Sequence, residues 1–194
     1  EIGPGVGNLC MVFQKELNIK KLNYCLIDFS EAIIFSALNL MYHVPNAKFV
    51  LPHEVNAKNV IKNEGNITFI TPEQINKLPK NKFDIGINTN SFHEMSKEII
   101  NNYFRMMRKV LKNKNLLFTV NRVEKAMDLI TGRSVNTKFA SKEIYLKSNK
   151  NIIINRFDEY NWMKLDKIVA YHTSEFNKIK TKNNFQLKIV KLKK

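Results

Sequence analysis

Short apolar runs alternate along the chain with longer segments in which hydrophobic residues recur at helical spacing. The short runs predict β-strands and the longer segments predict α-helices. The strands are expected at 22–27, 66–70, 83–88 and 115–120, and the helices at 9–17, 30–44 and 96–111. Strands that alternate with helices indicate the α/β class, a parallel sheet with helices on both faces. In such folds the ligand binds across the carboxyl ends of the strands.

The remaining segments carry weaker patterns. A further strand and helix are expected between residues 48 and 65, and a short helix is expected to begin at 71–73 and end near Pro79. Residues 123–151 are expected to form a polar helical or loop region around Gly132. A short strand is expected at 152–154, and a last pair of strands at 169–173 and 186–192. No repeat or linker divides the chain, so a single domain is expected over 1–194.

Three of the six glycines lie within the first eight residues, EIGPGVGN. Glycines at positions 3, 5 and 7 permit a sharp turn and let a ligand approach bare backbone. Glu1 stands two residues before the first glycine, and Asp28 follows the next predicted strand at the distance expected for a ribose contact. This GxGxG spacing resembles the S-adenosylmethionine motif of class I methyltransferases. A dinucleotide-binding Rossmann enzyme prefers GxGxxG, which would place glycine where this chain has Asn8.

The glycine motif normally follows the first strand of its fold, yet here it begins at residue 1. We therefore expect the first strand to be truncated and the chain to be an N-terminally truncated fragment of its domain.

Length and composition are those of one globular domain, with 194 residues of which 44% are hydrophobic. The sequence contains no apolar run of 18 residues and no signal-peptide pattern, so we expect no membrane span and a cytoplasmic protein. Cys10 and Cys25 lie in apolar surroundings without metal-type spacing. Both are expected to be reduced core residues.

The formal net charge of +15 permits binding to phosphate-rich partners. However, only five of the 32 basic residues are Arg, and the lysines are scattered along the chain without an Arg-aromatic cluster. We therefore regard a nucleic-acid partner as unfavoured. The positive field would equally attract an acidic substrate, such as a nucleotide sugar, or an anionic membrane surface.

Several longer stretches carry a more specific resemblance. The chain contains FDIGINTNSFHEM at Phe83–Met95, preceded by ITFITPEQ and followed by YFRMMRKVLKNKNLLFTVNR and RFDEYNW. Over nearly its whole length it resembles the sugar O-methyltransferases of bacterial glycan biosynthesis. The resemblance implies a Rossmann-like, seven-stranded methyltransferase sheet with an antiparallel last strand. It also implies S-adenosylmethionine as methyl donor and a sugar hydroxyl as acceptor.

The resemblance and the motif positions together assign a cofactor site. Glu1 would orient the methionine ammonium, Asp28 would accept the ribose hydroxyls, and the turn at Thr71 would lie against the adenine. Asn88 would offer its backbone carbonyl to the ammonium. The residues expected to bind the cofactor are Glu1, Gly3, Gly5, Gly7, Asp28, Phe29, Thr71, Pro72 and Asn88.

Methyl transfer to a hydroxyl needs correct positioning and one base, because the sulfonium donor is already activated. His93 and Glu94 follow the third predicted strand, where the methyl group is expected, and a histidine suits proton transfer near neutral pH. Glu94 either acts as the base itself, orients His93, holds a sugar hydroxyl or serves the turn. The other three histidines, His43, His53 and His172, are expected to be surface or structural residues.

The C-terminal third offers candidates for the sugar pocket, because sugars favour bidentate polar contacts beside an aromatic ring. Arg122, Arg156, Asp158 and Trp162 are the candidates, with Glu159 beside them, although structural salt bridges explain the charged residues equally well. No group of acidic residues and histidines has metal-ligand spacing, so no metal is predicted.

Two other functions remain open from the sequence. One is a methyltransferase that acts on RNA or protein, which the basic charge permits. An Asn-Pro-Pro-aromatic motif after the third strand would favour an amino nitrogen as acceptor, and NTNSF does not match it. The other is a non-catalytic binding domain of the same fold, although the glycines and Asp28 are both present. The acceptor sugar and the oligomeric state are not defined by the sequence.

Overall fold

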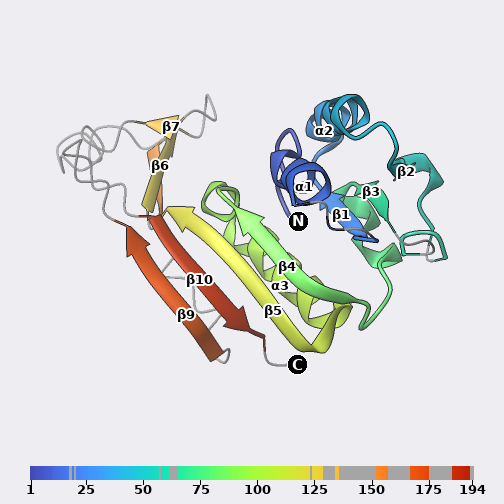
Figure 1. Ribbon diagram of the computed structural model, residues 1–194. Coiled ribbons are helices and arrows are strands. Elements are labelled where there is room, and N and C mark those ends of the chain that lie inside the picture. The colour runs from blue at the N-terminus through green and yellow to red at the C-terminus, as the bar shows by residue number, and fades with distance from the viewer. Residues whose placement is uncertain are drawn as a thin grey trace.

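Helices and strands alternate through the first half of the protein, and strands dominate the second half (Figure 1). The computed structural model describes residues 1–17, 19, 21–56, 58–61, 65–122, 124–128, 134–135, 152–156, 167–174 and 185–192. Its helices are α1 (Asn8–Met11), the π-helix η1 (Val12–Glu16), α2 (Ser30–His43), α3 (Lys97–Val110) and the 3₁₀ helices η2 (Pro52–Glu54), η3 (Pro72–Lys77) and η4 (Phe92–Glu94). Its strands are β1 (Tyr24–Ile27), β2 (Lys48–Val50), β3 (Asn66–Ile70), β4 (Phe83–Thr89), β5 (Leu111–Arg122), β6 (Glu124–Asp128), β7 (Ser134–Val135), β8 (Ile152–Arg156), β9 (Lys167–Ser174) and β10 (Phe185–Lys191).

The described strands form three sheets. The first is parallel, in the order β1-β3-β2, and the second has the order β4-β5-β10-β9. Within the second sheet β4 and β5 are parallel, whereas β10 runs antiparallel to both β5 and β9. Isolated bridges join Ile2 to Ile27 of β1 and to Asn88 of β4, so one residue connects the first two sheets. The third sheet, β7-β6-β8, is antiparallel.

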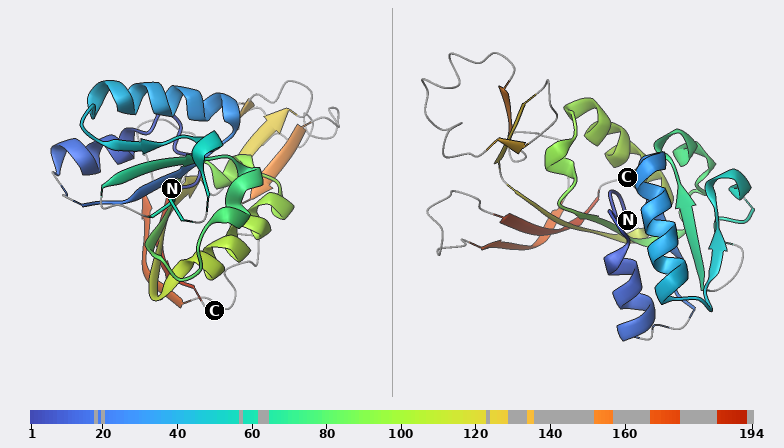
Figure 2. Two further views of the ribbon diagram at one scale, coloured as in Figure 1. Left: turned by 90° about the vertical axis from the view of Figure 1, so that its right-hand side faces the viewer. Right: turned by 90° about the horizontal axis from the view of Figure 1, so that it is seen from above.

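Alternation along β1 explains why helices pack on both faces of the first sheet. Tyr24 and Leu26 belong to a buried cluster with residues of α1 and α2, whereas Cys25 and Ile27 belong to another cluster with residues of α3. Successive side chains of a strand point to opposite faces, so a wholly apolar run of four residues needs cover on both sides. Figure 2 shows α2 above the strands and α3 below them.

The helix α3 follows the sequence pattern closely. The Ser96 hydroxyl accepts a hydrogen bond from the Ile99 amide at 3.3 Å and caps its first turn. Ile100, Phe104 and Met107 are almost fully buried beneath the second sheet. An amphipathic helix of this kind is stabilised mainly by burying its apolar face.

Most predicted elements are confirmed, and the differences have local reasons. The strand predicted at 115–120 extends over Leu111–Arg122, because β4 and β10 provide partners along its two edges. The short helix after Thr71 is a 3₁₀ helix. The expected seven-stranded sheet is not confirmed as one continuous sheet, because β1 and β4 are joined through isolated bridges at Ile2 and not through a strand between them.

One prediction was wrong for part of the C-terminal region. Within 123–151, expected to be helical or loop, Glu124–Asp128 and Ser134–Val135 are strands. The sequence EKAMD has little intrinsic preference for strand, but β6 pairs with both β7 and β8, and such pairing overrides local propensity.

Candidate functional site

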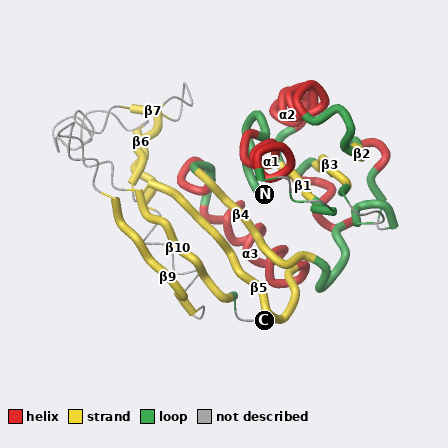
Figure 3. Tube along the Cα trace, viewed as in Figure 1, coloured by secondary structure: helices red, strands yellow, loops and turns green. Residues whose placement is uncertain are grey.

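The carboxyl ends of β1, β3 and β4 lie on either side of the glycine turn. This turn, the loop between the N-terminus and α1, can be followed in Figure 3. Gly3 donates its amide to the Ile27 carbonyl and Ile2 donates to the Ile87 carbonyl, both at 2.9 Å, so the turn leaves directly from the two sheets. Asp28 follows β1 immediately, and Asn90 follows β4. The edge predicted from the strand order therefore contains most of the expected cofactor residues.

The glycines of the turn are required for different reasons. All three have positive φ, at 66° for Gly3, 57° for Gly5 and 79° for Gly7. A Cβ on Gly3 would lie 2.3 Å from the side chain of Ser91, and one on Gly7 would lie 2.9 Å from Leu40. Around Gly5, in contrast, no atom would lie within 4 Å of an added Cβ. Gly5 therefore leaves open space beside exposed backbone, as a bound ligand would need.

Two side chains of α2 hold the turn in place. The Ser36 hydroxyl donates to the Gly5 carbonyl, and the Asn39 amide donates to the Val6 carbonyl at 2.8 Å. Both polar residues were missed in the sequence. The sequence did contain a pattern that could have identified them, because Ser36 and Asn39 are polar residues within the apolar part of α2.

The Asp28 carboxylate lies beside this turn. Its Oδ1 accepts a hydrogen bond from the Phe29 amide at 2.9 Å, and it also interacts with the Gly5 amide. Burial raises the pKa of Asp28, the two amides oppose this effect, and the negative charge of Glu94 adds to it. Asp28 is thus an acceptor close to Gly5 and within the electrostatic influence of Glu94. The ring of Phe29 beside it is 59% exposed.

The turn after β3 also contributes to this edge. The Thr71 amide donates to the Gln74 side chain at 3.1 Å, and a hydrogen bond with Thr71 lowers the pKa of Glu73. Tyr103 of α3 is buried, and burial together with Asp28 and Glu73 raises its pKa to about 12. Pro72 begins η3 next to Thr71. Tyr103 is therefore within the electrostatic influence of both Asp28 and Glu73.

A buried polar network lies between the glycine turn and η4. Asn88 is fully buried, and its side-chain amide donates to the Ile2 carbonyl at 3.0 Å and to the Ser91 hydroxyl. The Asn121 amide donates to Asn88 Oδ1 at 2.8 Å and to the Thr119 hydroxyl at 2.7 Å. Asn88 therefore has a role for its side chain, in addition to the backbone role expected of it. Ser91, Thr119 and Asn121 were not identified as site residues from the sequence.

His93 and Glu94, the two residues predicted to include the general base, lie at the end of this network. His93 is only 3% exposed, and its Nδ1 lies 3.1 Å from Asn121 Oδ1. Its Nε2 lies 3.9 Å from Oε1 of Glu94, whose side chain is 49% exposed. The histidine is thus the inner member of the pair and the carboxylate the outer one. Asn121, rather than Glu94, contacts Nδ1.

Glu1 has a partner within the chain. Its carboxylate accepts a hydrogen bond from the Tyr24 hydroxyl at 2.8 Å, and its amino group donates to the Cys25 carbonyl at 2.7 Å. Burial, followed by the Glu1 charge, raises the pKa of Tyr24. Glu1 is predicted to orient the methionine ammonium of the cofactor. It would have to do so while its carboxylate also accepts the hydrogen bond from the Tyr24 hydroxyl.

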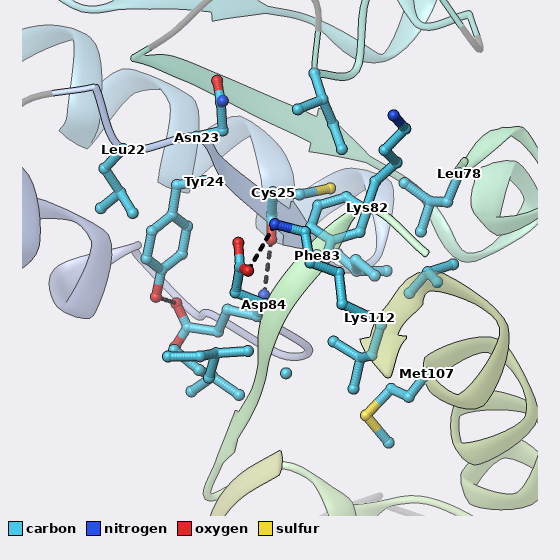
Figure 4. A pocket seen from close by; sticks show the side chains of 18 of the residues that line it. Leu22, Asn23, Tyr24, Cys25, Leu78, Lys82, Phe83, Asp84, Met107 and Lys112 are labelled. Carbon is cyan, nitrogen blue, oxygen red and sulfur yellow. Dashed lines mark hydrogen bonds and ion pairs between the residues drawn. The ribbon is translucent and has the colours of Figure 1, made fainter. Parts of the chain in front are cut away.

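Glu1 also lines a cavity of about 510 Å³ between the first two sheets. Figure 4 shows Tyr24 and Cys25 of β1, Phe83 and Asp84 of β4 and Met107 of α3 around it. The walls include the first residues of β1 and β4. The walls also include Ile27 and Ile87, whereas Asp28 and His93 are not among the lining residues.

The predicted sugar-binding residues lie largely beyond what can be described. Arg122 ends β5 and Arg156 ends β8, and only their backbones are described. β8 packs against η4, which carries His93 and Glu94. Asp158, Glu159 and Trp162 lie outside the described residues.

Neither a metal-binding cluster nor a membrane-spanning helix is present among the described residues. Among the ranges given above, no group of three or more His, Cys, Asp or Glu side chains is arranged to hold a metal ion. None of the helices described is both long and apolar enough to cross a membrane.

Comparison with known proteins defines the fold. No protein-family model and no curated protein matches the chain. Among solved structures, a protein from Pyrococcus horikoshii OT3 superimposes with a TM-score of 0.60 and 13% identity, over 99% of this chain and 80% of the other. An S-adenosylmethionine-dependent methyltransferase from Methanosarcina mazei gives 0.58 and 13%, over 100% and 91%. The mitomycin 7-O-methyltransferase MmcR gives 0.54 and 10%, over 97% of this chain and 47% of that enzyme.

At these identities the similarity establishes an α/β methyltransferase-like fold. The chain spans less than half the length of MmcR, so the activity of that enzyme does not transfer to it directly.

Proposed function

We propose that this chain transfers a methyl group from S-adenosylmethionine to a hydroxyl of a sugar or glycan precursor. The observation that carries the proposal is the contact between the Asp28 carboxylate and the amide of Gly5, at the open side of the glycine turn. A carboxylate placed there suits the two hydroxyls of a ribose, and exposed glycine backbone suits a closely packed ligand. Methyltransferases among the structural neighbours support the same cofactor.

The residues present fit the cofactor. Asp28 would hold the ribose, the exposed Phe29 and the turn at Thr71 and Pro72 would flank the adenine, and the backbone of the glycine turn would contact the methionine part. When bound, S-adenosylmethionine supplies a methyl group already activated by its sulfonium. The chain therefore has to hold an acceptor hydroxyl in line and take its proton.

The proton is taken by the pair of His93 and Glu94. The acceptor oxygen would take the methyl group as the methyl–sulfur bond of the bound cofactor breaks, which leaves S-adenosylhomocysteine, and His93 and Glu94 would take the proton of the acceptor hydroxyl. Glu94 is exposed and can meet the substrate, whereas His93 lies behind it at 3.9 Å. Their proximity to Asp28 is indicated by the effect of the Glu94 charge on the Asp28 carboxyl.

A sugar acceptor is supported by the resemblance carried by FDIGINTNSFHEM and RFDEYNW. Arg122, Arg156, Asp158 and Trp162 are proposed to form its pocket. The position of β8 against η4 supports the inclusion of Arg156, because Arg156 belongs to a strand that lies beside the element that carries the proposed base. The net charge of +15 permits one alternative, a methyltransferase that acts on RNA or protein.

The first test is cofactor binding by calorimetry. S-adenosylmethionine and its demethylated product, S-adenosylhomocysteine, should bind, and NAD should not. Asp28→Ala should weaken binding of the demethylated product by roughly 1–3 kcal/mol, the scale of a lost hydrogen bond to a charged group. Asp84→Ala is a matched control, because Asp84 is an exposed aspartate paired with Lys112 at the other end of the strands. Equal affinity of wild type and the Asp28 variant would contradict the proposed site.

The second test identifies the acceptor. The protein would be incubated with methyl-labelled S-adenosylmethionine and, separately, a panel of nucleotide sugars and glycan precursors, total RNA, and a protein lysate. Label should pass to a sugar hydroxyl. Transfer to RNA alone would favour the alternative, and binding of the cofactor without any transfer would favour a non-catalytic domain.

A further inference from the structure

The buried polar network contains one amide whose orientation is fixed by the backbone. Asn88 Oδ1 lies 3.3 Å from the Phe92 amide, and Asn88 Nδ2 lies 3.0 Å from the Ile2 carbonyl. A backbone N–H can only donate and a carbonyl can only accept. The oxygen and nitrogen of the Asn88 side chain are therefore distinguished by two independent backbone groups, one on η4 and one beside the glycine turn.

This orientation determines that of Asn121. The side chain of Asn121 places one polar atom 2.8 Å from Asn88 Oδ1. Because Asn88 Oδ1 only accepts, that atom must be the amide nitrogen, which also donates to the Thr119 hydroxyl at 2.7 Å. The oxygen of Asn121 is then the atom that lies 3.1 Å from His93 Nδ1.

The orientation of Asn121 in turn determines the proton position on His93. An amide oxygen has no hydrogen to donate, so the contact is a hydrogen bond only when Nδ1 of the imidazole carries the proton. In a neutral imidazole one nitrogen is protonated and the other is not. Nε2 is then the unprotonated nitrogen, and it is the one 3.9 Å from the Glu94 carboxylate.

We propose that Asn121 is a positioning residue that holds neutral His93 as the Nδ1–H tautomer and makes Nε2 the nitrogen that accepts a proton. All the polar groups concerned are buried, since Asn88 and Asn121 are 0% exposed, Thr119 1% and His93 3%. Buried amides of this kind stay in one orientation, because reversing either one would place two acceptors or two donors against each other.

This tautomer gives the pair of His93 and Glu94 a definite direction for proton uptake. In the neutral Nδ1–H tautomer the Nε2 lone pair faces the Glu94 carboxylate, and two acceptors repel each other. Uptake of a proton at Nε2 converts this repulsion into an ion pair, so the carboxylate favours proton uptake at that nitrogen. This consequence rests on the proposed function. The network also begins at the Ile2 carbonyl, one residue before Gly3, so it connects the orientation of His93 with the glycine turn.

The direct test is ¹⁵N NMR of the full chain labelled in its histidine rings, at a pH at which imidazole is neutral. One-bond and long-range correlations distinguish the two tautomers. His43, His53 and His172 provide internal references, and the spectrum of His93→Gln identifies the His93 signals by their absence. The expected result is a protonated Nδ1 and an unprotonated Nε2 for His93. A wild-type ring with its proton on Nε2 would overturn the proposal without any variant.

Two variants distinguish Asn121 from the rest of the network. In Asn121→Ala the acceptor for Nδ1–H is removed, so the ratio of Nδ1–H to Nε2–H tautomer should fall by roughly 2- to 10-fold, the worth of one hydrogen bond. Thr119→Val is the matched control, because it removes another partner of Asn121 and leaves the bond to His93 and the bond to Asn88. If both variants changed the ratio equally, Asn121 would not be the residue that sets it.

The proposed function is tested separately by methyl transfer. If the tautomer is as expected but His93→Ala retains turnover, Asn121 still positions His93 and the proposed base is wrong. If methyl transfer depends on His93 but its proton lies on Nε2, the base stands and the positioning role of Asn121 is wrong. The two failures are therefore distinguishable.

Discussion

Asp28 at the carboxyl edge combines a proposed role in cofactor binding with a cost to folding. Its pKa is raised above the usual 3.8, mainly by burial, so the folded protein binds a proton at this carboxyl more readily than the unfolded chain. Ionisation of Asp28 therefore lowers the free energy of unfolding. The loss begins as the pH rises above about 3.8 and is complete above the raised pKa.

We therefore expect Asp28→Asn to be more stable than wild type at pH 7, because the uncharged amide keeps the oxygen that accepts from Phe29. The advantage should disappear below pH 3.8, where wild-type Asp28 is protonated in both states. Urea unfolding at the two pH values measures the difference. Asp84→Asn, which removes an exposed ion pair with Lys112, should instead lose less than about 1 kcal/mol. An Asp28→Asn protein less stable than wild type at pH 7 would show that the charge stabilises the fold.

The two cysteines give a prediction about reactivity. Cys10 and Cys25 are free and buried, as expected from the sequence, and burial raises their pKa to about 12 and about 11. Since the thiolate is the reactive species, neither should be alkylated by iodoacetamide at pH 8 in the native protein. Both should react once urea has unfolded it. Mass spectrometry gives the count, and rapid labelling of Cys25 in native buffer would indicate that the cavity beside it opens readily.

The proposed base predicts a difference between two variants. His93→Ala should lower turnover by about 10²- to 10⁴-fold and leave cofactor affinity nearly unchanged, because a positioned base acts in the chemical step. Glu94→Gln should be milder if Glu94 only stabilises the protonated ring. The rate of methyl transfer in a single turnover, measured for each variant, distinguishes the two roles. An inactive Glu94→Gln beside a fully active His93→Ala would assign the base to the exposed carboxylate.

Sequence reasoning at this scale found the residues that follow strands and missed those that support them. Gly5 and Asp28 could be identified because a motif and a strand end determine their positions. Asn121 could not, because its role depends on β4 and β5 lying side by side, with Asn88 paired opposite Thr119. Pairing between strands 33 residues apart leaves no local pattern.

At the scale of elements, the glycine turn predicts different effects for two similar substitutions. Gly5→Ala should retain the fold and cost about 1–2 kcal/mol, because a left-handed φ of 57° is unfavourable for alanine but the space is open. It should also weaken cofactor binding, since the new methyl group occupies the open side of the turn. Gly3→Ala should be far more destabilising, because its Cβ would lie 2.3 Å from Ser91. Urea unfolding measures the stability of both variants, and calorimetry measures their cofactor binding. Equal stabilities would contradict the distinction between a tightly packed Gly3 and an open Gly5.

Helices and buried strands were predictable because their hydrophobic period is set locally. α3 combines a Ser96 cap with apolar residues at helical spacing, and β1 and β3 are buried along their whole length because both faces are covered. β6 was not predictable, since its sequence has no strand pattern and its structure depends on pairing with β8, some 30 residues later. Tertiary pairing determines such elements.

At the scale of the whole molecule, the candidate site spans two sheets that share one bridging residue. The glycine turn and Asp28 belong to the side of β1, whereas Asn88 and η4 belong to the side of β4, and Ile2 pairs with both. The parallel pairing of β1 with β3 and of β4 with β5 was predicted from the alternation of elements in the sequence, and so was the position of these residues at the carboxyl ends of the strands. The separation of the sheets was not, because it depends on how far backbone pairing extends on each side of Ile2.

A cofactor bound at this edge should therefore stabilise both sheets together. At 100 times its dissociation constant, S-adenosylhomocysteine should raise the free energy of unfolding by about 2.7 kcal/mol, if it binds only the folded state. Hydrogen exchange should slow in β1 and in β4 alike, because the ligand would contact residues from both sides of Ile2. NAD is the control and should change neither measurement. Protection confined to β1 would indicate that Asn88 and η4 do not belong to the cofactor site, and the proposed base would then lie too far from the methyl group to act.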